Sequence, residues 1–218
     1  MTMHASAEVL LMLLADARLP VAGHTQSAGL EPAVTAGLAA GQVPDYLATR
    51  LATVTRVEAA TAVVALHRLH RGLALEPVEA AWAARTPSAA MRRTSRVQAK
   101  ALLRLLTHLN GPAAHKVGPC RAVVLATAAT GFGLSAMSLA RLIGYDDVQT
   151  VASAALKLMP LDPAATTRWV YDALPSVDAL ARDVAALTEP EEIPVAGAPQ
   201  IEAWAEAHAV ASRRLFSA

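Results

Sequence analysis

Apolar side chains recur three or four residues apart through most of this chain, and proline and glycine divide the pattern into segments. The first segment places Val9, Leu13 and Ala17 at this spacing. Such residues share one side of an α-helix, because the helix turns once every ~3.6 residues. No run alternates apolar and polar residues, and no segment repeats another. We therefore expect an all-α fold, a single-domain bundle of about ten helices.

The helix boundaries follow from capping residues, proline and glycine. Ser6 is placed to cap the first helix, which should end near Arg18 because Pro20 follows. Asp146 with Gln149 resembles a capping box for a later helix. The other helices are expected at 32–37, 45–70, 76–85, 87–109, 120–130, 134–143, 146–159, from 163, at 176–188 and at 200–212.

A stretch rich in proline and glutamate divides the chain near its end. Residues 189–199 read EPEEIPVAGAP, which is typical of a linker. We therefore expect a helical domain at 1–188, this linker, and a C-terminal helix with a tail at 200–218.

The composition predicts a core of small and aliphatic side chains. Hydrophobic residues make up 54% of the chain, whereas aromatic residues make up 4%. Leu, Val and Ala must therefore fill the core, which favours closely packed helices over sheet. The single cysteine, Cys120, cannot form an internal disulfide, so we expect a reducing compartment, the cytoplasm.

Two apolar stretches need to be distinguished from membrane segments. The N-terminus lacks a basic start and carries Glu8 early, unlike a signal peptide. Residues 122–140 have no charge, but Gly131 and Gly133 interrupt them, which favours a buried helical hairpin over a membrane span. We expect no membrane association.

Charge is distributed unevenly although the formal net charge is only +1. Nine basic residues and no acidic residue occur between Glu79 and Asp146. Four of these cations recur at every fourth position of one expected helix: Arg92, Arg96, Lys100 and Arg104. They form either a solvated face or a stripe that docks an acidic protein partner. Nucleic acid is disfavoured, because no aromatic residue is interleaved with them.

The sequence shows no arrangement that carries enzymatic chemistry. His67 and His70 are three apart on a helix, a weak metal signal that a solvated helix end also explains. The glycines of TGFGLSA lack the strand context of a dinucleotide site, and no phosphate-binding loop occurs. Ser27, His24 and Glu31 lie on one turn without a second base or an oxyanion donor. We expect no catalytic, metal or cofactor site.

The stretch LPVAGHTQSAGLE at residues 19–31 is more elaborate than a helix connection requires. Pro20 fixes one backbone angle, whereas Gly23 and Gly29 permit conformations that other residues resist. The stretch is either a structural corner between two helices or a corner that also presents Ser27, Gln26 or His24 to a partner.

This corner resembles the N-terminal signature of the urease accessory protein family UreF. Residues that match it are Pro20, Val21, Gly23, Ser27, Gly29, Leu30 and Glu31. His24 and Gln26 stand where the family usually has aromatic residues, which indicates a divergent branch of actinobacterial type. The segments RTPSAAMRRTSRVQAKALLRL, AALKLMPL and AHAVASRRLFSA resemble later family motifs in the family order.

The resemblance implies a non-enzymatic, all-α adaptor that tends to form a homodimer. Such adaptors act with UreD (also called UreH) and the GTPase UreG on apo-urease, in GTP-dependent nickel insertion. Nickel and GTP are handled by the GTPase, so no cofactor is expected here. The alternative from the residues alone is a helical regulator that binds a small ligand or nucleic acid.

The resemblance also implies which residues bind partners. For UreD they are the tail residues Arg213, Arg214, Leu215 and Phe216. For UreG they are the corner residues Pro20, Gly23, Ser27, Gly29 and Glu31, with the basic residues Arg92, Arg96 and Lys100.

Overall fold

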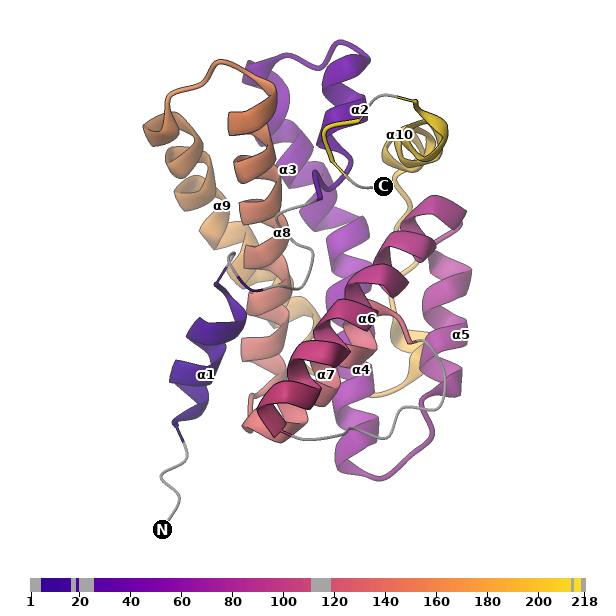
Figure 1. Cartoon of the computed structure of the whole chain (residues 1–218). Coiled ribbons are helices and arrows are strands. Elements are labelled where there is room, and N and C mark those ends of the chain that lie inside the picture. The colour runs from indigo at the N-terminus through magenta and orange to yellow at the C-terminus, as the bar shows by residue number, and fades with distance from the viewer. Residues whose placement is uncertain (1–4, 17–18, 20–25, 111–118, 213, 217–218) are drawn as a thin grey trace.

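Helices make up nearly all of the regular structure in this computed structural model. It describes the chain except for residues 1–4, 17–18, 20–25, 111–118, 213 and 217–218. The described elements are α1 (Ala7–Leu14), α2 (Leu30–Thr35), the 3-10 helix η2 (Ala40–Gln42), α3 (Val43–Ala52), α4 (Val54–His70), α5 (Glu76–Arg85), α6 (Ala89–Asn110), α7 (Arg121–Phe132), α8 (Ala136–Leu158), α9 (Pro163–Val184), the 3-10 helix η3 (Pro190–Glu192) and α10 (Pro199–Val210). The described residues contain no strand, so the predicted all-α bundle of about ten helices is confirmed (Figure 1).

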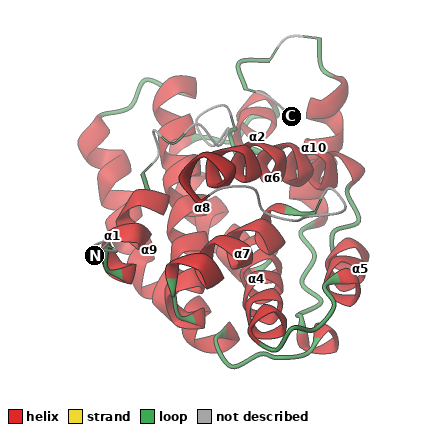
Figure 2. Ribbon diagram, turned by 60° about the horizontal axis from the view of Figure 1, so that its bottom comes forward, coloured by secondary structure: helices red, strands yellow, loops and turns green. Residues whose placement is uncertain are grey.

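The central helix is α4, which is apolar on nearly every side. Eight successive residues, 59–66, are buried. A helix buried on all faces needs neighbours on all faces, and α4 packs against α3, α5, α7, α8 and α9. Figure 2 shows it beside α7 within the bundle.

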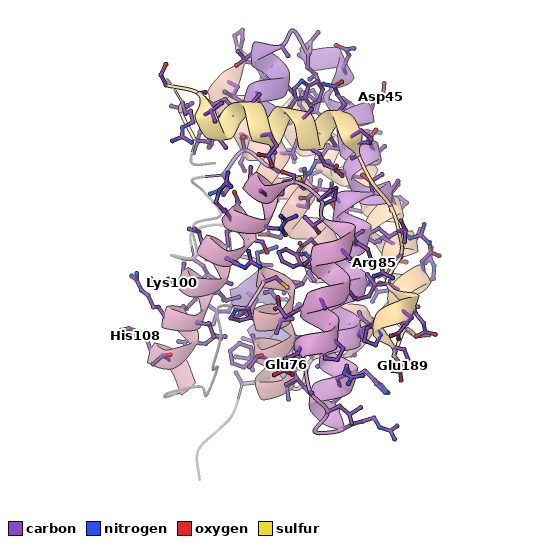
Figure 3. All side chains as sticks on the ribbon, turned by 90° about the vertical axis from the view of Figure 1, so that its right-hand side faces the viewer. Asp45, Glu76, Arg85, Lys100, His108 and Glu189 are labelled. Carbon is purple, nitrogen blue, oxygen red and sulfur yellow. The ribbon has the colours of Figure 1, made fainter. Side chains whose placement is uncertain are left out.

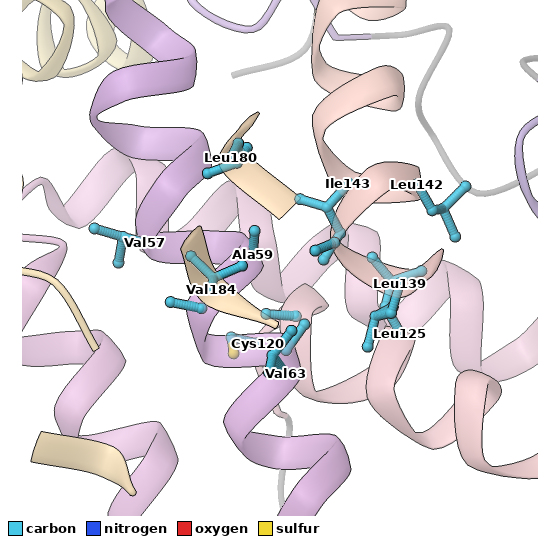
Figure 4. Packing of buried hydrophobic residues seen from close by; sticks show 14 of the residues in the cluster. Val57, Ala59, Val63, Cys120, Leu125, Leu139, Leu142, Ile143, Leu180 and Val184 are labelled. Atoms are coloured by element: carbon cyan, nitrogen blue, oxygen red, sulfur yellow. The ribbon is translucent and has the colours of Figure 1, made fainter. Parts of the chain in front are cut away.

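Small side chains bring these helices close together. Ala126 and Ala129 of α7 are fully buried, and α7 packs on α4. Aliphatic side chains such as Val63 and Leu139 fill the space between helices (Figure 4). A Cβ atom added at Gly144 would lie 2.9 Å from Val177, so α8 meets α9 closely at this glycine. The core is aliphatic, as the composition predicts.

The single helix expected at 45–70 is wrong, because α3 and α4 are separate helices that meet at Thr53. Thr53 has φ −123° and ψ −96°, outside helical geometry. In one straight helix Arg50 and Thr55 would point about 140° apart. With the break, the Arg50 and Thr55 side chains both bind the Asp147 carboxylate. The break therefore allows a contact between residues far apart in the chain, which local sequence patterns do not predict.

Two expected breaks are absent. The helix α8 continues through Asp146, because the Asp146 carboxylate accepts a hydrogen bond from Arg121 instead of capping a helix. The helix α9 continues through Pro175. Proline at 175 leaves the carbonyl of Tyr171 without a helical donor, but both residues are exposed, so water can satisfy that carbonyl.

The last two segments wrap the bundle. Ile193, within residues 189–199, is buried, and its carbonyl accepts a hydrogen bond from Arg85 at 2.5 Å. The carboxylate of Glu206 on α10 accepts hydrogen bonds from the Ser88 hydroxyl (2.6 Å) and the Ala90 N–H (2.8 Å). These contacts fix α10 to the start of α6. The division into a domain, a linker and a tail stays a prediction.

No helix in the described part of the chain is both long enough and apolar enough to cross a membrane. Residues 122–140 form α7 and the beginning of α8. The chain turns between them at Gly133, which has a φ of 67° and ends α7.

Candidate partner-binding site

The described part of the corner, residues 26–31, contains a tightly specified turn at the start of α2. Ala28 and Gly29 have φ values of 51° and 78°, a left-handed pair. The Ser27 hydroxyl accepts a hydrogen bond from the Glu31 N–H at 3.2 Å. A Cβ atom at Gly29 would lie 2.9 Å from the Tyr46 hydroxyl oxygen. Glycine at this position is therefore required both by the backbone angle and by the close approach of Tyr46.

A buried cluster of Arg50, Thr55 and Asp147, which we call the helix joint, binds the backbone of the corner. The Arg50 guanidinium donates to both Asp147 carboxylate oxygens, at 2.9 and 2.6 Å, and to the Ala28 carbonyl at 2.8 Å. The Thr55 hydroxyl donates to Asp147 at 2.8 Å, and the Tyr46 hydroxyl donates to Ala28 at 2.7 Å. One carboxylate thus ties α3, α4 and α8 together, while Arg50 links it to the corner.

Burial and charge act in opposite directions on these groups. Burial alone would lower the pKa of Arg50, but the neighbouring Asp147 and Tyr46 raise it above its ordinary value. Burial raises the pKa of Tyr46 as well. The guanidinium therefore stays charged and the phenol neutral, so both groups keep the protons that they donate to the Asp147 carboxylate and the Ala28 carbonyl.

A second cluster, which we call the tail joint, holds the end of the chain. The Glu31 carboxylate contacts the His208 Nε2 atom at 3.0 Å and accepts hydrogen bonds from the N–H groups of Leu215 (2.5 Å) and Phe216 (2.9 Å). The Phe216 side chain is buried, with the Lys157 ammonium 5.1 Å from its ring centre. The corner and the tail, identified from separate motifs, therefore meet at one carboxylate.

A cavity of about 140 Å³ lies between the corner, α6, α8 and α10. Its wall includes the ion pair of Arg121 with Asp146, at 2.6 Å, and Glu58, which accepts a hydrogen bond from the Trp82 indole N–H at 2.7 Å. Burial raises the pKa of Glu58. Among the residues that the structure describes, no group of three or more His, Cys, Asp or Glu is placed to hold a metal ion.

The basic stripe winds gradually around α6. Every fourth residue of an α-helix advances by about 400°, so the stripe drifts about 40° per step around α6. The Arg92 guanidinium turns back to the carbonyls of Thr86 and Pro87, and Arg96 lies over the Trp82 ring, 5.7 Å from its centre. Lys100 points outward (Figure 3). Arg96, Lys100 and Arg104 are exposed, whereas Arg92 is only partly exposed.

The structure brings part of the predicted partner-binding set together. Ser27, Gly29 and Glu31 form the corner, and Glu31 contacts the tail. In the tail Leu215 is 63% exposed whereas Phe216 is 5% exposed, so only the first presents its side chain outward. Pro20, Gly23 and Arg213 lie outside the described residues.

Sequence reasoning missed the helix joint, although one signal was present. The buried residues of α3 are Val43, Tyr46, Leu47, Arg50 and Leu51. Their spacing is that of an apolar helix face, and Arg50 is the one cation among them. An arginine on such a face needs a buried carboxylate, but nothing local identifies Asp147 as that partner.

Comparisons with known proteins agree with the motifs. The family model for UreF matches residues 38–174. The urease accessory protein UreF of Mycobacterium sp. strain JLS is 32% identical over 95% of this chain and 97% of its own length. The chain belongs to the UreF family. Two further relatives carry the same name. The UreF protein of Mycolicibacterium vanbaalenii is 31% identical over 95% of this chain and 97% of its own length. The UreF protein of Mycobacterium tuberculosis strain H37Rv is 34% identical over 72% of this chain and 75% of its own length. These matches confirm the resemblance to UreF and its actinobacterial character.

Proposed function

We propose that this UreF-family protein is a non-catalytic adaptor for nickel insertion into apo-urease. In this proposal it binds UreD and the GTPase UreG as a homodimer, and the GTPase handles both GTP and nickel. The observation that carries the proposal is family membership along nearly the whole chain, since relatives covering 95% of it bear the name urease accessory protein.

The tail joint supports a role in linking two partners. An adaptor binds its partners cooperatively when its separate surfaces are energetically coupled. Here the Glu31 carboxylate belongs to the corner, yet it accepts hydrogen bonds from the backbone of Leu215 and Phe216. A partner that draws the tail away would leave Glu31 without these donors. Binding at the tail is therefore energetically coupled to the corner.

Urease purified from cells with and without this gene tests the proposal, with nickel content and activity measured at matched amounts of urease protein. We expect urease that lacks nickel in the deletion strain and regains it when the gene is restored. Fully loaded urease in the deletion strain would overturn the proposed role.

The tail joint can be tested in the same cells. Glu31→Gln removes the negative charge that the tail amides and His208 contact, so we expect reduced nickel loading. Glu191→Gln is a matched control, because Glu191 is an exposed glutamate for which no side-chain contact is seen within the described residues. Equal nickel loading of urease with both variants would show that the tail joint is not needed for urease maturation.

A further inference from the structure

The outward face of α6 carries a basic surface that includes one exposed apolar residue. We call it the α6 face and define it by four exposed residues, Arg93, Val97, Lys100 and Arg104, beside which Arg96 is also exposed. These positions fall within about 60° of one another on a helix. The opposite side of α6 is buried through Ser95, Ala99, Leu102 and Leu106. The α6 face is therefore presented by a helix whose other side is fixed in the bundle.

The cations of the α6 face are poorly neutralised. No acidic residue occurs in the sequence between Glu79 and Asp146. Among the described residues no carboxylate forms a salt bridge with Lys100 or Arg104. Arg93 acts electrostatically on a nearby carboxylate, Glu206. A surface with this positive potential attracts an acidic partner.

The exposed valine argues against a face that is merely solvated. Val97 is 57% exposed, and Arg93 and Lys100 are its neighbours on the helix surface, four residues before it and three after it. An exposed valine beside cations offers both an apolar and a charged contact to a protein partner. Nucleic acid fits less well, because no aromatic residue occurs in α6 to stack with bases.

A second copy of the chain is also a poor occupant. The acidic residues Glu189, Glu191 and Glu192 lie around η3, and Figure 3 shows Glu189 at the edge of the molecule opposite Lys100. Pairing of the α6 face with this acidic region would join unlike surfaces. Such a heterologous contact produces open chains of molecules unless its rotation closes a ring.

We propose that the α6 face is a docking surface for an acidic segment of another protein, with an apolar side chain of that segment seated on Val97. Arg92 is not part of this surface, because its guanidinium is bound to backbone carbonyls, whereas the exposed Arg96 borders the surface and lies over the Trp82 ring. It does not rest on the urease role, because only charge, exposure and helix geometry carry it.

Photo-crosslinking in cells identifies the occupant. A photoreactive amino acid replaces Val97, and in a control it replaces Val195, which is 87% exposed but belongs to the 189–199 segment. We expect a protein adduct from position 97 that is absent from position 195. A nuclease-sensitive adduct, an adduct containing only this chain, or no adduct specific to position 97 would overturn the proposal.

Binding of the purified captured protein then tests the chemistry. We expect Lys100→Glu and Arg104→Glu each to weaken its Kd several-fold and together by about tenfold or more. Arg71→Glu, a charge reversal at an exposed residue away from α6, should leave the Kd unchanged. All three sites are exposed, so equal thermal unfolding temperatures serve as the folding control. Equal weakening by Arg71→Glu, or a Kd insensitive to the α6 reversals, would contradict the docking surface.

Discussion

The helix joint and the tail joint both hold the corner through a carboxylate, but they differ in what supplies their donors. In the helix joint Asp147 binds side chains of α3 and α4. In the tail joint Glu31 binds backbone N–H groups of Leu215 and Phe216, which follow the last helix. The first joint connects helices that the core already packs together. The second fixes the chain end, whose Phe216 side chain also packs into the hydrophobic core.

Burial does not explain this difference. The side chains of Arg50 and Asp147 are 8% and 15% exposed, and those of His208 and Glu31 are 8% and 12% exposed. Local opening depends on how many other contacts must break with a joint. The helix joint connects three helices, whereas the tail joint connects two helices and also the backbone that follows the last helix. The comparison teaches that carboxylates of similar burial can hold either helices alone or helices together with a chain end.

The largest expected effect comes from removing the carboxylate of the helix joint. Asp147→Ala leaves the Arg50 guanidinium buried without its anion, so we expect the free energy of unfolding to fall by about 3–5 kcal/mol. Urea unfolding followed by circular dichroism measures this loss. Asp146→Ala is the neighbouring control: its pair with Arg121 is more exposed and should cost about 1 kcal/mol. Equal losses of unfolding free energy in both variants would mean that the helix joint stabilises the fold no more than the Arg121–Asp146 pair does.

The helices of this fold could be predicted from the sequence, but the joints could not. Periodicity and the stops at 110–112 and 131–133 give most helix bounds, because they reflect local geometry. The partners Arg50 and Asp147 are 97 residues apart in the chain. That long-range pair explains both the unexpected break before α4 and part of why residues 146–147 lie inside α8 instead of capping a helix.

The candidate site shows the same division. The corner and the tail were each recognisable as motifs, but their meeting joins Glu31 to residues 177 to 185 positions later. On α6 a spacing of four was taken as one face, and Arg96, Lys100 and Arg104 are exposed, whereas Arg92 is partly buried. The actual exposed set depends on which side of α6 packs on the bundle, and neighbouring helices decide that.

A smaller loss should follow from straining the turn between the two joints. Gly29→Ala places a methyl group in a backbone conformation with φ 78° and within 2.9 Å of the Tyr46 hydroxyl. We expect destabilisation by about 1–3 kcal/mol, measured by thermal or urea unfolding. Gly37→Ala is a close control, because Gly37 has φ 103° but no atom within 4 Å of an added Cβ. An excess loss at Gly29 measures the Tyr46 contact, and no excess would show that the turn can yield.

The tail joint should respond locally more than globally. Glu31→Gln keeps the shape of the side chain but removes the charge that accepts hydrogen bonds from the tail, so we expect a loss of about 1–2 kcal/mol in unfolding free energy. Amide hydrogen exchange at Leu215 and Phe216 should accelerate by about tenfold or more, while exchange in α4 changes only with global stability. If tail and α4 exchange accelerate equally, the tail joint is not an independent unit.

The smallest effect concerns Glu58, a carboxylate in the wall of the cavity between the corner, α6, α8 and α10. It accepts a hydrogen bond from the Trp82 indole N–H instead of from a guanidinium. Burial raises its pKa above the ordinary value of 4.5. The folded protein therefore binds this proton more tightly than the unfolded chain does. Stability from the protonated form is fully present below pH 4.5 and is lost as pH rises toward the folded pKa.

Glu58→Gln removes this titration while it keeps an oxygen that accepts from Trp82. We expect the unfolding free energy of the variant, relative to the original protein, to be lowest below the ordinary glutamate pKa and to increase as pH rises above it, before levelling off. Urea unfolding at a series of pH values measures this difference, in which titrations common to both proteins cancel. Asp147 provides the contrast, because its negative charge is bound by Arg50 and Thr55 in the fold. If the difference in unfolding free energy between the two proteins stays constant with pH, Glu58 is solvated in the folded protein. Carboxylates at this cavity would then need no bound cation to remain charged.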